Sequence, residues 1–332
     1  MKTFGKRALC RALAPLALAG LAGAATAQDT MVGYVSPIAS QPGQAMANEI
    51  METMAGELGW DYRMLDANLS PDRQVSHVDT LVTLGGDVIS SWSLDPNAVA
   101  AAYTRANEAG VRVIGVNSEG PGVTMTVWWE TNLCVDGGAY DVQAAWIKDR
   151  RPDAKVIVMG GPPVPSIQQN TRCFEAAAKA AGFEVLAQVD NTKDSTANAA
   201  TIAADLLVRH PDADVFWAYN DSSALGISAA VMASGKGVYG GDSTDGVMIF
   251  GMNGDEEAIA AIREGRITGS WDPDVYGMAA AIVLGMKSLL DAPGDAQDDL
   301  IVKAKLLTAD NIADYVPTMD RGYTIDTVPL LK

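Results

Sequence analysis

Short apolar segments alternate with longer segments rich in small residues along almost the whole chain, and this alternation constrains the fold more than any other feature. The apolar segments, such as 31–36 (MVGYVS) and 155–159 (KVIVM), are typical of buried strands. Segments such as 44–59 have helical spacing and end at a glycine. Strands separated by helices predict parallel sheets covered on both faces. The other predicted strands are 61–66, 87–91, 111–116, 183–189, 214–218 and 247–252, and the other predicted helices lie near 71–84, 95–109, 166–181, 196–209, 221–234, 255–264 and 277–290.

An internal repeat divides this pattern of strands and helices into two halves. Residues 88–120 and 215–256 each contain an apolar strand, a polar strand end, an Ala-rich helix and a second strand that ends on an asparagine, Asn117 or Asn253. Two such units facing one another would bring both sets of strand ends to a shared cleft, where open α/β sheets bind ligands. Similar βα units within a single sheet would also produce the repeat.

Three segments interrupt the alternation: 120–135, 268–274 and 303–310. The first, GPGVTMTVWWETNLC at 120–134, has no helical apolar spacing. These breaks predict a chain that crosses three times between two lobes and so forms a hinge.

Four blocks together resemble the periplasmic sugar-binding proteins of ABC transporters, in their ribose-binding-like, type I group. They read DTMVGYVSPIASQPG, SWSLDPNAVAAAYTRANEAGVRVIGVNS, RHPDADVFWAYNDSSALG and VMIFGMNGDEEAIAAIREGRITGSWDPDVYG. The resemblance implies an α/β fold of two Rossmann-like lobes, with parallel sheets flanked by helices and a three-segment hinge. We therefore expect one lobe from 28–131 with 272–304, and the other from 132–271 with 305–332.

The resemblance also implies ligand contacts from the first lobe. Gln41 matches a hydrogen-bonding position in the first loop, whose alternative role is turn structure. Trp92 stands at a strand end where ribose binders carry an asparagine, and its indole would stack on a sugar while its N–H donates to a hydroxyl; core packing is the alternative. Asn117 and Ser118 replace an Asp-Arg pair that would grip vicinal hydroxyls, so a ligand other than ribose is favoured.

In the second lobe, the resemblance implies three more ligand-contacting positions at which this chain differs from its family. Asn170 falls where the family has an arginine, Asn253 where ribose binders have an aspartate, and Trp271 where they have a glutamine. An exposed helical asparagine is the alternative for Asn170. Amides suit neutral hydroxyls because they both donate and accept hydrogen bonds.

The pair Asn220-Asp221 follows the strand 214–218. Asn220 matches the family's ligand-binding asparagine, and Asp221 is then expected to cap the helix that follows, with ligand contact as its alternative. Asp194 is a further candidate ligand contact from the loop that faces the first lobe. Trp128 and Trp129 either extend an aromatic wall or pack the hinge, and the sequence does not separate these roles.

The N-terminus reads as a secretory signal peptide over residues 1–27. It has a basic head, an apolar stretch too short to span a bilayer, and the cleavage motif Ala25-Thr26-Ala27. Its removal takes away four basic residues and lowers the formal net charge from −17 to −21. We therefore expect a soluble periplasmic monomer that binds no nucleic acid. Cys134 and Cys173 remain in an oxidising compartment, where a disulfide is one of two outcomes.

The signatures of common enzymes and cofactors are absent from the sequence. There is no GxSxG elbow, Walker lysine, GxGxxG spacing or His/Cys cluster, so no catalytic residue, cofactor or metal is expected. The sequence therefore predicts a non-enzymatic protein that captures a sugar or polyol and delivers it to an ABC permease. The alternatives are a sensor that presents a sugar or an autoinducer-type furanose to a membrane receptor, and a secreted carbohydrate-active enzyme.

Overall fold

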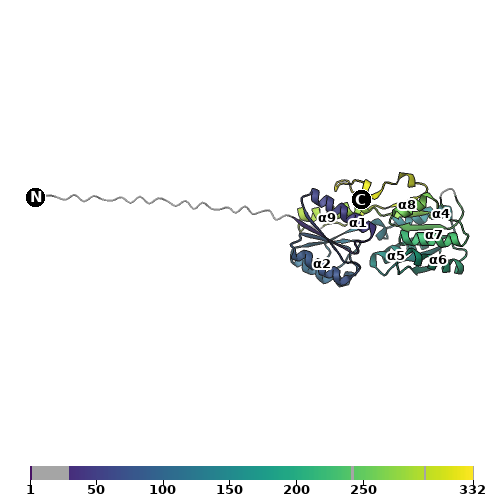
Figure 1. Ribbon diagram of the computed structural model, residues 1–332, viewed down its shortest axis with the longest axis horizontal. Helices are drawn as coiled ribbons and strands as arrows, with labels where there is room; N and C mark the ends of the chain where they lie inside the picture. The colour runs from purple at the N-terminus through teal and green to yellow at the C-terminus, as the bar shows by residue number, and fades with distance from the viewer. Residues whose placement is uncertain (2–29, 241–242, 295–296, 332) are drawn as a thin grey trace.

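The computed structural model describes Met1 and residues 30–240, 243–294 and 297–331, and it contains two six-stranded sheets (Figure 1). The strands are β1 (Met31–Ser36), β2 (Asp61–Asp66), β3 (Val88–Ser91), β4 (Arg112–Val116), β5 (Met125–Trp129), β6 (Lys155–Gly160), β7 (Glu184–Asp190), β8 (Val215–Ala218), β9 (Met248–Met252), β10 (Gly269–Asp272), β11 (Leu300–Val302) and β12 (Lys305–Thr308). The helices are α1 (Pro42–Glu57), α2 (Pro71–Thr83), α3 (Pro96–Glu108), α4 (Ala139–Arg150), α5 (Pro165–Ala180), α6 (Thr196–Arg209), α7 (Asp221–Ala233), α8 (Glu256–Arg263) and α9 (Val275–Asp291), with the short 3₁₀ turns η1 (Glu130–Asn132), η2 (Ile312–Asp314) and η3 (Thr318–Asp320).

The first sheet has the order β11-β5-β4-β3-β1-β2, and all its strand pairs are parallel. The second has the order β12-β10-β9-β8-β6-β7, in which only the pairing of β12 with β10 is antiparallel. This architecture confirms the predicted α/β fold with two parallel-dominated sheets.

The helices begin where the sequence supplies starting residues. Proline stands in the first turn of α1, α2, α3 and α5, where its missing N–H has no partner to lose. Side chains of Ser70, Asp95 and Ser195 accept hydrogen bonds from backbone N–H groups at the starts of α2, α3 and α6. Local sequence thus fixes most of the points at which strand ends turn back into helices.

Helices cover both faces of each sheet, with a hydrophobic core between each helical layer and its sheet. On the first sheet, α1 and α9 pack together on one face although they lie far apart in the sequence, and α2 and α3 cover the other (Figure 1). On the second sheet, α6, α7 and α8 cover one face and α4 and α5 the other. Because each sheet has a core on both of its faces, a ligand can reach it only at the strand ends.

The chain passes between the sheets three times. It leaves the first sheet after β5, returns between β10 and α9, and leaves again between β11 and β12. The interpretation of 120–135 as one irregular crossover was wrong in part, because β5 lies inside it and pairs with β4 and β11. Its alternating MTVWW pattern is the strand signal, and only the residues after 129 form the connection.

The division of the chain into lobes at 28–131 with 272–304 and 132–271 with 305–332 stays a prediction. Ile312 and Tyr315 pack against the second-sheet core that contains α6 and α7. Residues 323–330 instead pack against the first-sheet core, and Leu330 pairs antiparallel with Val302 of β11. The segment 309–331, called here the C-terminal strap, therefore contacts both halves.

The predicted signal peptide falls on residues that lie outside the described part of the chain, apart from Met1. Among the described helices, none combines the length and the apolar composition needed to cross a bilayer.

Candidate functional site

The two halves touch at the carboxyl ends of their strands. Trp92 follows β3 of the first sheet, and its indole Nε1 lies 3.4 Å from Oγ of Ser166 at the start of α5. A parallel sheet places all its strand ends at one edge, so this contact marks the place where both edges meet.

An aromatic pair lines this junction. The rings of Trp92 and Trp129 meet edge to face, with centroids 5.1 Å apart and an angle of 80° between the planes. The Nε1 atom of Trp129 is buried and has no hydrogen-bond partner among the described residues. Trp128 points elsewhere, since its Nε1 donates to Asp299 at 3.0 Å in an exposed contact. Alternation along β5 thus separates the two tryptophans, and only Trp129 belongs to the junction.

Asn117, at the end of β4, holds Trp129 in place. Its Oδ1 accepts a hydrogen bond from the backbone N of Trp129 at 2.6 Å, and its side chain is 2% exposed. Its Nδ2 is buried without a partner among the described residues. The backbone adopts φ 46°, a left-handed conformation that asparagine tolerates better than most residues. Asn117 therefore has one amide atom committed to the protein and one unpaired donor.

Ser118 has a structural role in this structure. Its Oγ accepts from the backbone N of Ser93 at 3.0 Å and donates to the carbonyl of Val116 at 3.0 Å. Both bonds stay within the first half and tie the ends of β3 and β4 together. Ser118 thus supports the neighbouring loop, and its ligand contact stays a prediction.

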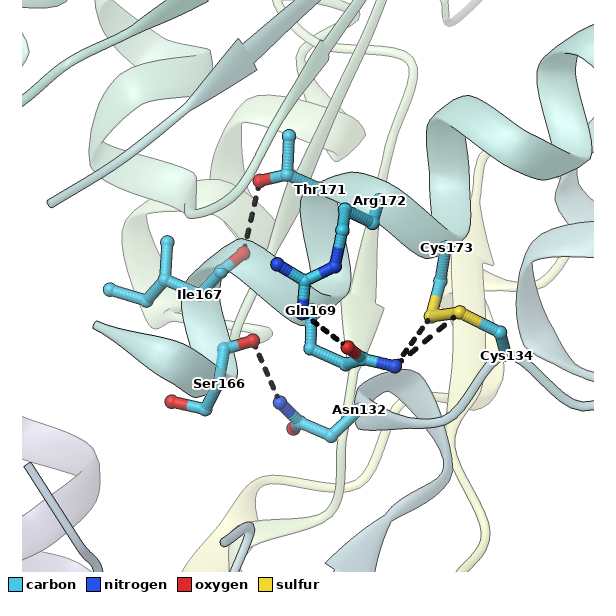
Figure 2. Close-up of a disulfide and its surroundings, with 8 residues drawn as sticks. All are labelled: Asn132, Cys134, Ser166, Ile167, Gln169, Thr171, Arg172 and Cys173. Atoms are coloured by element: carbon cyan, nitrogen blue, oxygen red, sulfur yellow. Dashed lines mark hydrogen bonds between the residues drawn. A yellow bond between two sulfur atoms is a disulfide. The ribbon is translucent and has the colours of Figure 1, made fainter. Parts of the chain in front are cut away.

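The connection after β5 lies against α5. Nδ2 of Asn132 donates to the carbonyl of Ser166 at 3.1 Å. The amide of Asn170 is best satisfied when its nitrogen donates to the carbonyl of Thr131 at 2.7 Å and to that of Ser166 at 3.3 Å. Thr131 Oγ1 and Asn132 Oδ1 are buried with no partner among the described residues. A disulfide between Cys134 and Cys173 joins the same two segments (Figure 2).

These contacts form one continuous group of side chains, called here the strand-end cluster. Its members are Trp92, Asn117, Trp129, Thr131, Asn132, Ser166 and Asn170. The cluster brings together Trp92, Asn117 and Asn170 of the sequence-predicted set. Sequence reasoning missed Thr131, Asn132 and Ser166 and left Trp129 open; the position of Trp129 at the end of a strand was the usable signal.

Asn220 caps α7, the role that was expected for Asp221. Its Oδ1 accepts from the backbone N of Ser223 at 2.9 Å, and its Nδ2 donates to Oδ1 of Asp194 at 2.8 Å. The hydroxyl of Tyr219 donates to the same oxygen of Asp194. Burial, followed by the nearby Asp194, raises the pKa of Tyr219 above its ordinary value, so this hydroxyl keeps its proton. The exposed side chain of Asp194 therefore accepts hydrogen bonds from Tyr219 and Asn220, the two residues that follow β8.

Asp221 is the buried first residue of α7 and does not cap the helix, and its ligand contact stays a prediction. It is 0% exposed, and its carboxylate accepts from Oγ of Ser270 at 2.6 Å and from the backbone N of Asp255 at 2.9 Å. Gly251 makes room for it, since a Cβ at Gly251 would lie 2.2 Å from Oδ1 of Asp221. Burial, and secondly the charge of Asp255, raises the pKa of Asp221 well above its usual range. Asp221 joins α7 to β10 and the start of α8.

Trp271 is also a core residue here. It is 3% exposed, its Nε1 donates to Oε1 of Gln143 at 2.9 Å, and its ring meets Tyr140 edge to face. The Trp271 ring thus packs in a core of the second sheet, and its ligand contact stays a prediction. Its backbone carbonyl accepts from the N of Asn253, which is half-buried and has φ 120°.

Gln41, Asp194, Asn220 and Asn253 lie at the same strand-end edges but outside the contacts of the strand-end cluster. Gln41 is exposed at the start of α1 and makes no capping hydrogen bond with its side chain. Within the described residues, no group of three or more His, Cys, Asp or Glu side chains is arranged to hold a metal ion. The chemistry gathered at the junction is that of amides, hydroxyls and indoles.

Known proteins share this architecture. The ribose import binding protein RbsB of Salmonella typhimurium is 26% identical over 287 residues, which cover 86% of this chain and 88% of the relative. The protein of the same name from Bacillus subtilis is 27% identical over 234 residues, covering 69% and 72%. Both relatives are covered over more than two thirds of their length.

Solved structures match the fold. The Caulobacter myo-inositol binding protein bound to myo-inositol superposes with a TM-score of 0.73 at 23% identity, over 88% of this chain and 98% of that one. A periplasmic ribose ABC transporter structure from Conexibacter woesei gives 0.75 at 18% identity, over 91% and 97%. The sequence profile described as "Periplasmic binding protein domain" matches residues 32–294. The chain belongs to this family of periplasmic binding proteins.

Proposed function

We propose that the chain is a solute-binding protein of an ABC importer, which captures a neutral sugar or polyol at the strand-end cluster. The relatives are named as ribose import binding proteins, and a structural neighbour is described with bound myo-inositol. Binding without turnover is part of the proposal, because the relatives are named as binding proteins.

The unpaired polar atoms of the strand-end cluster carry this proposal. Nδ2 of Asn117, Nε1 of Trp129, Oγ1 of Thr131 and Oδ1 of Asn132 are all buried without partners among the described residues. A buried polar group without a partner costs about 1–3 kcal/mol. A ligand whose hydroxyl groups bond to these atoms would recover that free energy, and amides and hydroxyls suit hydroxyls that both donate and accept.

The ligand we propose carries no net charge. None of the seven members of the strand-end cluster is ionisable. The indole of Trp92 is half-buried beside Trp129, which suits the C–H face of a sugar or cyclitol ring. A buried charge on the ligand would have no opposite charge in the cluster, and unpaired buried charges are strongly unfavourable.

Closure of the two halves is the proposed mechanism. Trp92 and Asn117 come from the first half, and Ser166 and Asn170 from the second, so a ligand bonded to both sets stabilises the closed arrangement over an open one. We propose that a membrane permease recognises this closed form, and that the protein acts as a periplasmic monomer after removal of its signal peptide.

Calorimetric titration of the protein lacking residues 1–27 with myo-inositol, D-ribose and D-allose tests the proposal. We expect saturable binding of at least one of them, and a hundredfold excess over Kd should raise the unfolding free energy by about 2.7 kcal/mol. Trp129→Ala should weaken binding at least tenfold, because it removes both a stacking surface and a donor.

Trp128→Ala is the matched control, since it removes the neighbouring indole from the outer face of β5 and should leave Kd unchanged. If neither these probes nor other neutral sugars and polyols bind, the proposed ligand class is wrong. Equal losses in the two tryptophan variants would show that the cluster is not the site.

A further inference from the structure

The Cys134–Cys173 disulfide joins two segments that meet at the strand-end cluster. Cys134 lies two residues after Asn132, on the connection that leaves the first sheet, and Cys173 lies in the middle of α5. Figure 2 shows the connection lying against α5, with Asn132 directed at the carbonyl of Ser166. The crosslink therefore fixes the place where the connection contacts the helix.

The connection has little other support. Residues 130–138 lie between β5 and α4 and pair with no strand among the described residues. At its start, Oε2 of Glu130 accepts from the backbone N of Ala304 at 3.0 Å. At its other end, hydrogen bonds link it to α5 through Asn132 and Asn170, and Nε2 of Gln169 donates to Sγ of Cys134. The disulfide is the covalent attachment of this end.

The attached segment carries two of the unpaired polar atoms of the candidate site. Thr131 is 0% exposed and Asn132 is 2% exposed, and Oγ1 of the first and Oδ1 of the second have no partner among the described residues. Oγ1 of Thr131 has no hydrogen bond to fix it, and Oδ1 of Asn132 is fixed through the bond from Nδ2 of the same amide to the carbonyl of Ser166 on α5. Their positions hence depend on the contact between the connection and α5.

We propose that Cys134 and Cys173 are positioning residues for ligand binding. Their disulfide holds Thr131 and Asn132 against α5 in the geometry that presents unpaired polar atoms to the ligand, so reduction weakens binding without unfolding the protein. This inference rests on the proposed function for its ligand, although the positioning itself does not require one. A binding segment that is already ordered gives higher affinity, because less conformational entropy is lost when the ligand binds.

The bond is open to a reductant. Cys134 is exposed, and a groove of about 150 Å³ lined by both cysteines with Val135 and Asp136 runs beside it. Nε2 of Gln169 lies 3.5 Å from one sulfur and 3.7 Å from the other, on the outer side of α5. A dithiol such as dithiothreitol supplies two electrons and two protons; the S–S bond breaks to two thiols while the dithiol closes to a cyclic disulfide.

The first experiment uses as its ligand whichever of myo-inositol, D-ribose or D-allose binds the wild type. Its Kd is measured for the wild type and for each variant, at a temperature well below the melting point of every protein. The Cys134→Ser/Cys173→Ser double variant should bind at least tenfold more weakly, and dithiothreitol should produce the same loss in the wild type, with recovery on reoxidation. Arg172→Ala, an exposed change next to Cys173, should leave Kd unchanged. Removing the cysteines from an Asn132→Ala background should cost much less than removing them from the wild type, because both changes act through one group.

The second experiment measures amide hydrogen exchange in oxidised and reduced protein without ligand. We expect exchange to rise more in a peptide covering 129–136 and in the first turns of α5 than in β1 and β8, whose rise should reflect only the lower global stability. A rise in 129–136 no greater than that in β1 and β8, or an unchanged Kd after complete reduction, would overturn the inference. If no probe binds while exchange still rises more in 129–136, the positioning stands and the proposed ligand class fails.

Discussion

Side chains at the junction divide into those committed to the protein and those with bonding capacity to spare. Ser118 and Asn220 have every suitable atom bonded to nearby backbone or side chains. Asn117 and Trp129 each retain a buried donor. This distinction, rather than residue type, separates support from recognition in the candidate site.

Asp221 should make the stability of the protein depend on pH. An unfolded aspartic acid titrates near 3.9, whereas burial and the nearby Asp255 raise the pKa of Asp221 in the folded state. The folded state then holds the proton to higher pH, so the unfolding free energy falls as pH rises from about 4 through the folded pKa. Asp221→Asn should flatten this fall, as measured by urea unfolding between pH 4 and 7.

Asp79→Asn is the comparison for Asp221→Asn, because Asp79 is an exposed carboxylate paired with Arg105. Loss of the Asp79 charge should leave the decrease in unfolding free energy above pH 4 as steep as in the wild type. A wild-type curve as flat as that of Asp221→Asn would contradict a raised pKa of Asp221 in the folded state.

Residue roles were less predictable from the sequence than residue locations. Strand-end positions follow from local patterns, and Trp92, Asn117 and Asn220 do lie where strands end. Which of Asn220 and Asp221 caps α7 depends on where the first helical residue falls, and α7 begins at Asp221, one residue earlier than a cap at Asp221 requires. The burial of Trp271 depends on Gln143, which is 128 residues away, and no local pattern contains that contact.

Among the helices, those that begin at strand ends link the fold to the site. The cap of α7 is a bond between Asn220 and Ser223, and the same asparagine reaches Asp194 in the loop after β7. The periodicity of strands and helices predicted these elements closely, because it is a local property. The disulfide and the strand β5 were harder to predict from the sequence. The disulfide depends on which cysteines lie close in space, and β5 lies in a segment that was read as irregular because it has no helical spacing.

Asn220→Ala should lower the unfolding free energy by about 0.5–2 kcal/mol through loss of the helix cap. Asn220→Ser keeps an oxygen that can cap α7 and should lose clearly less. Chemical denaturation of both variants at pH 7 measures the difference. Equal losses would mean that the contact with Asp194, rather than the cap, provides the stability.

Removal of the disulfide should lower global stability as well as affect the site. The cysteines are 39 residues apart, and chain entropy for a loop of this length predicts a loss of about 4 kcal/mol when the crosslink is absent. Urea unfolding of Cys134→Ser/Cys173→Ser against the oxidised wild type measures it. A loss below about 1 kcal/mol would show that the reduced chain keeps residual structure or that the bond is strained.

On the scale of the whole molecule, the C-terminal strap contacts both halves beside the connection between β10 and α9. Its Arg321 is 7% exposed in its side chain and is bonded to both Asp272 and Asp274, with 2.8 Å between Nη1 and the carboxylate of Asp274. These aspartates flank the connection between β10 and α9. A cavity of about 620 Å³, lined in part by Tyr315 and Tyr323, lies beside them.

Arg321→Ala should be strongly destabilising because it leaves two buried carboxylates without their cation. Breaking one side of a buried ion pair costs about 3–5 kcal/mol. Arg105→Ala breaks an exposed pair with Asp79 and should cost less than about 1 kcal/mol. Thermal and urea unfolding of both variants compare them directly, and similar small losses would show that the strap is not held by Arg321.

The contact between Trp92 and Ser166 would let the proposed closure be followed by the protein's own fluorescence. Separation of the halves would take the indole from a half-buried site beside Trp129 into water, and indole emission moves to longer wavelength as its surroundings become more polar. Trp128 keeps its partner Asp299 within the first half and would contribute a constant background. The ratio of emission at two wavelengths would then count closed molecules without any attached dye.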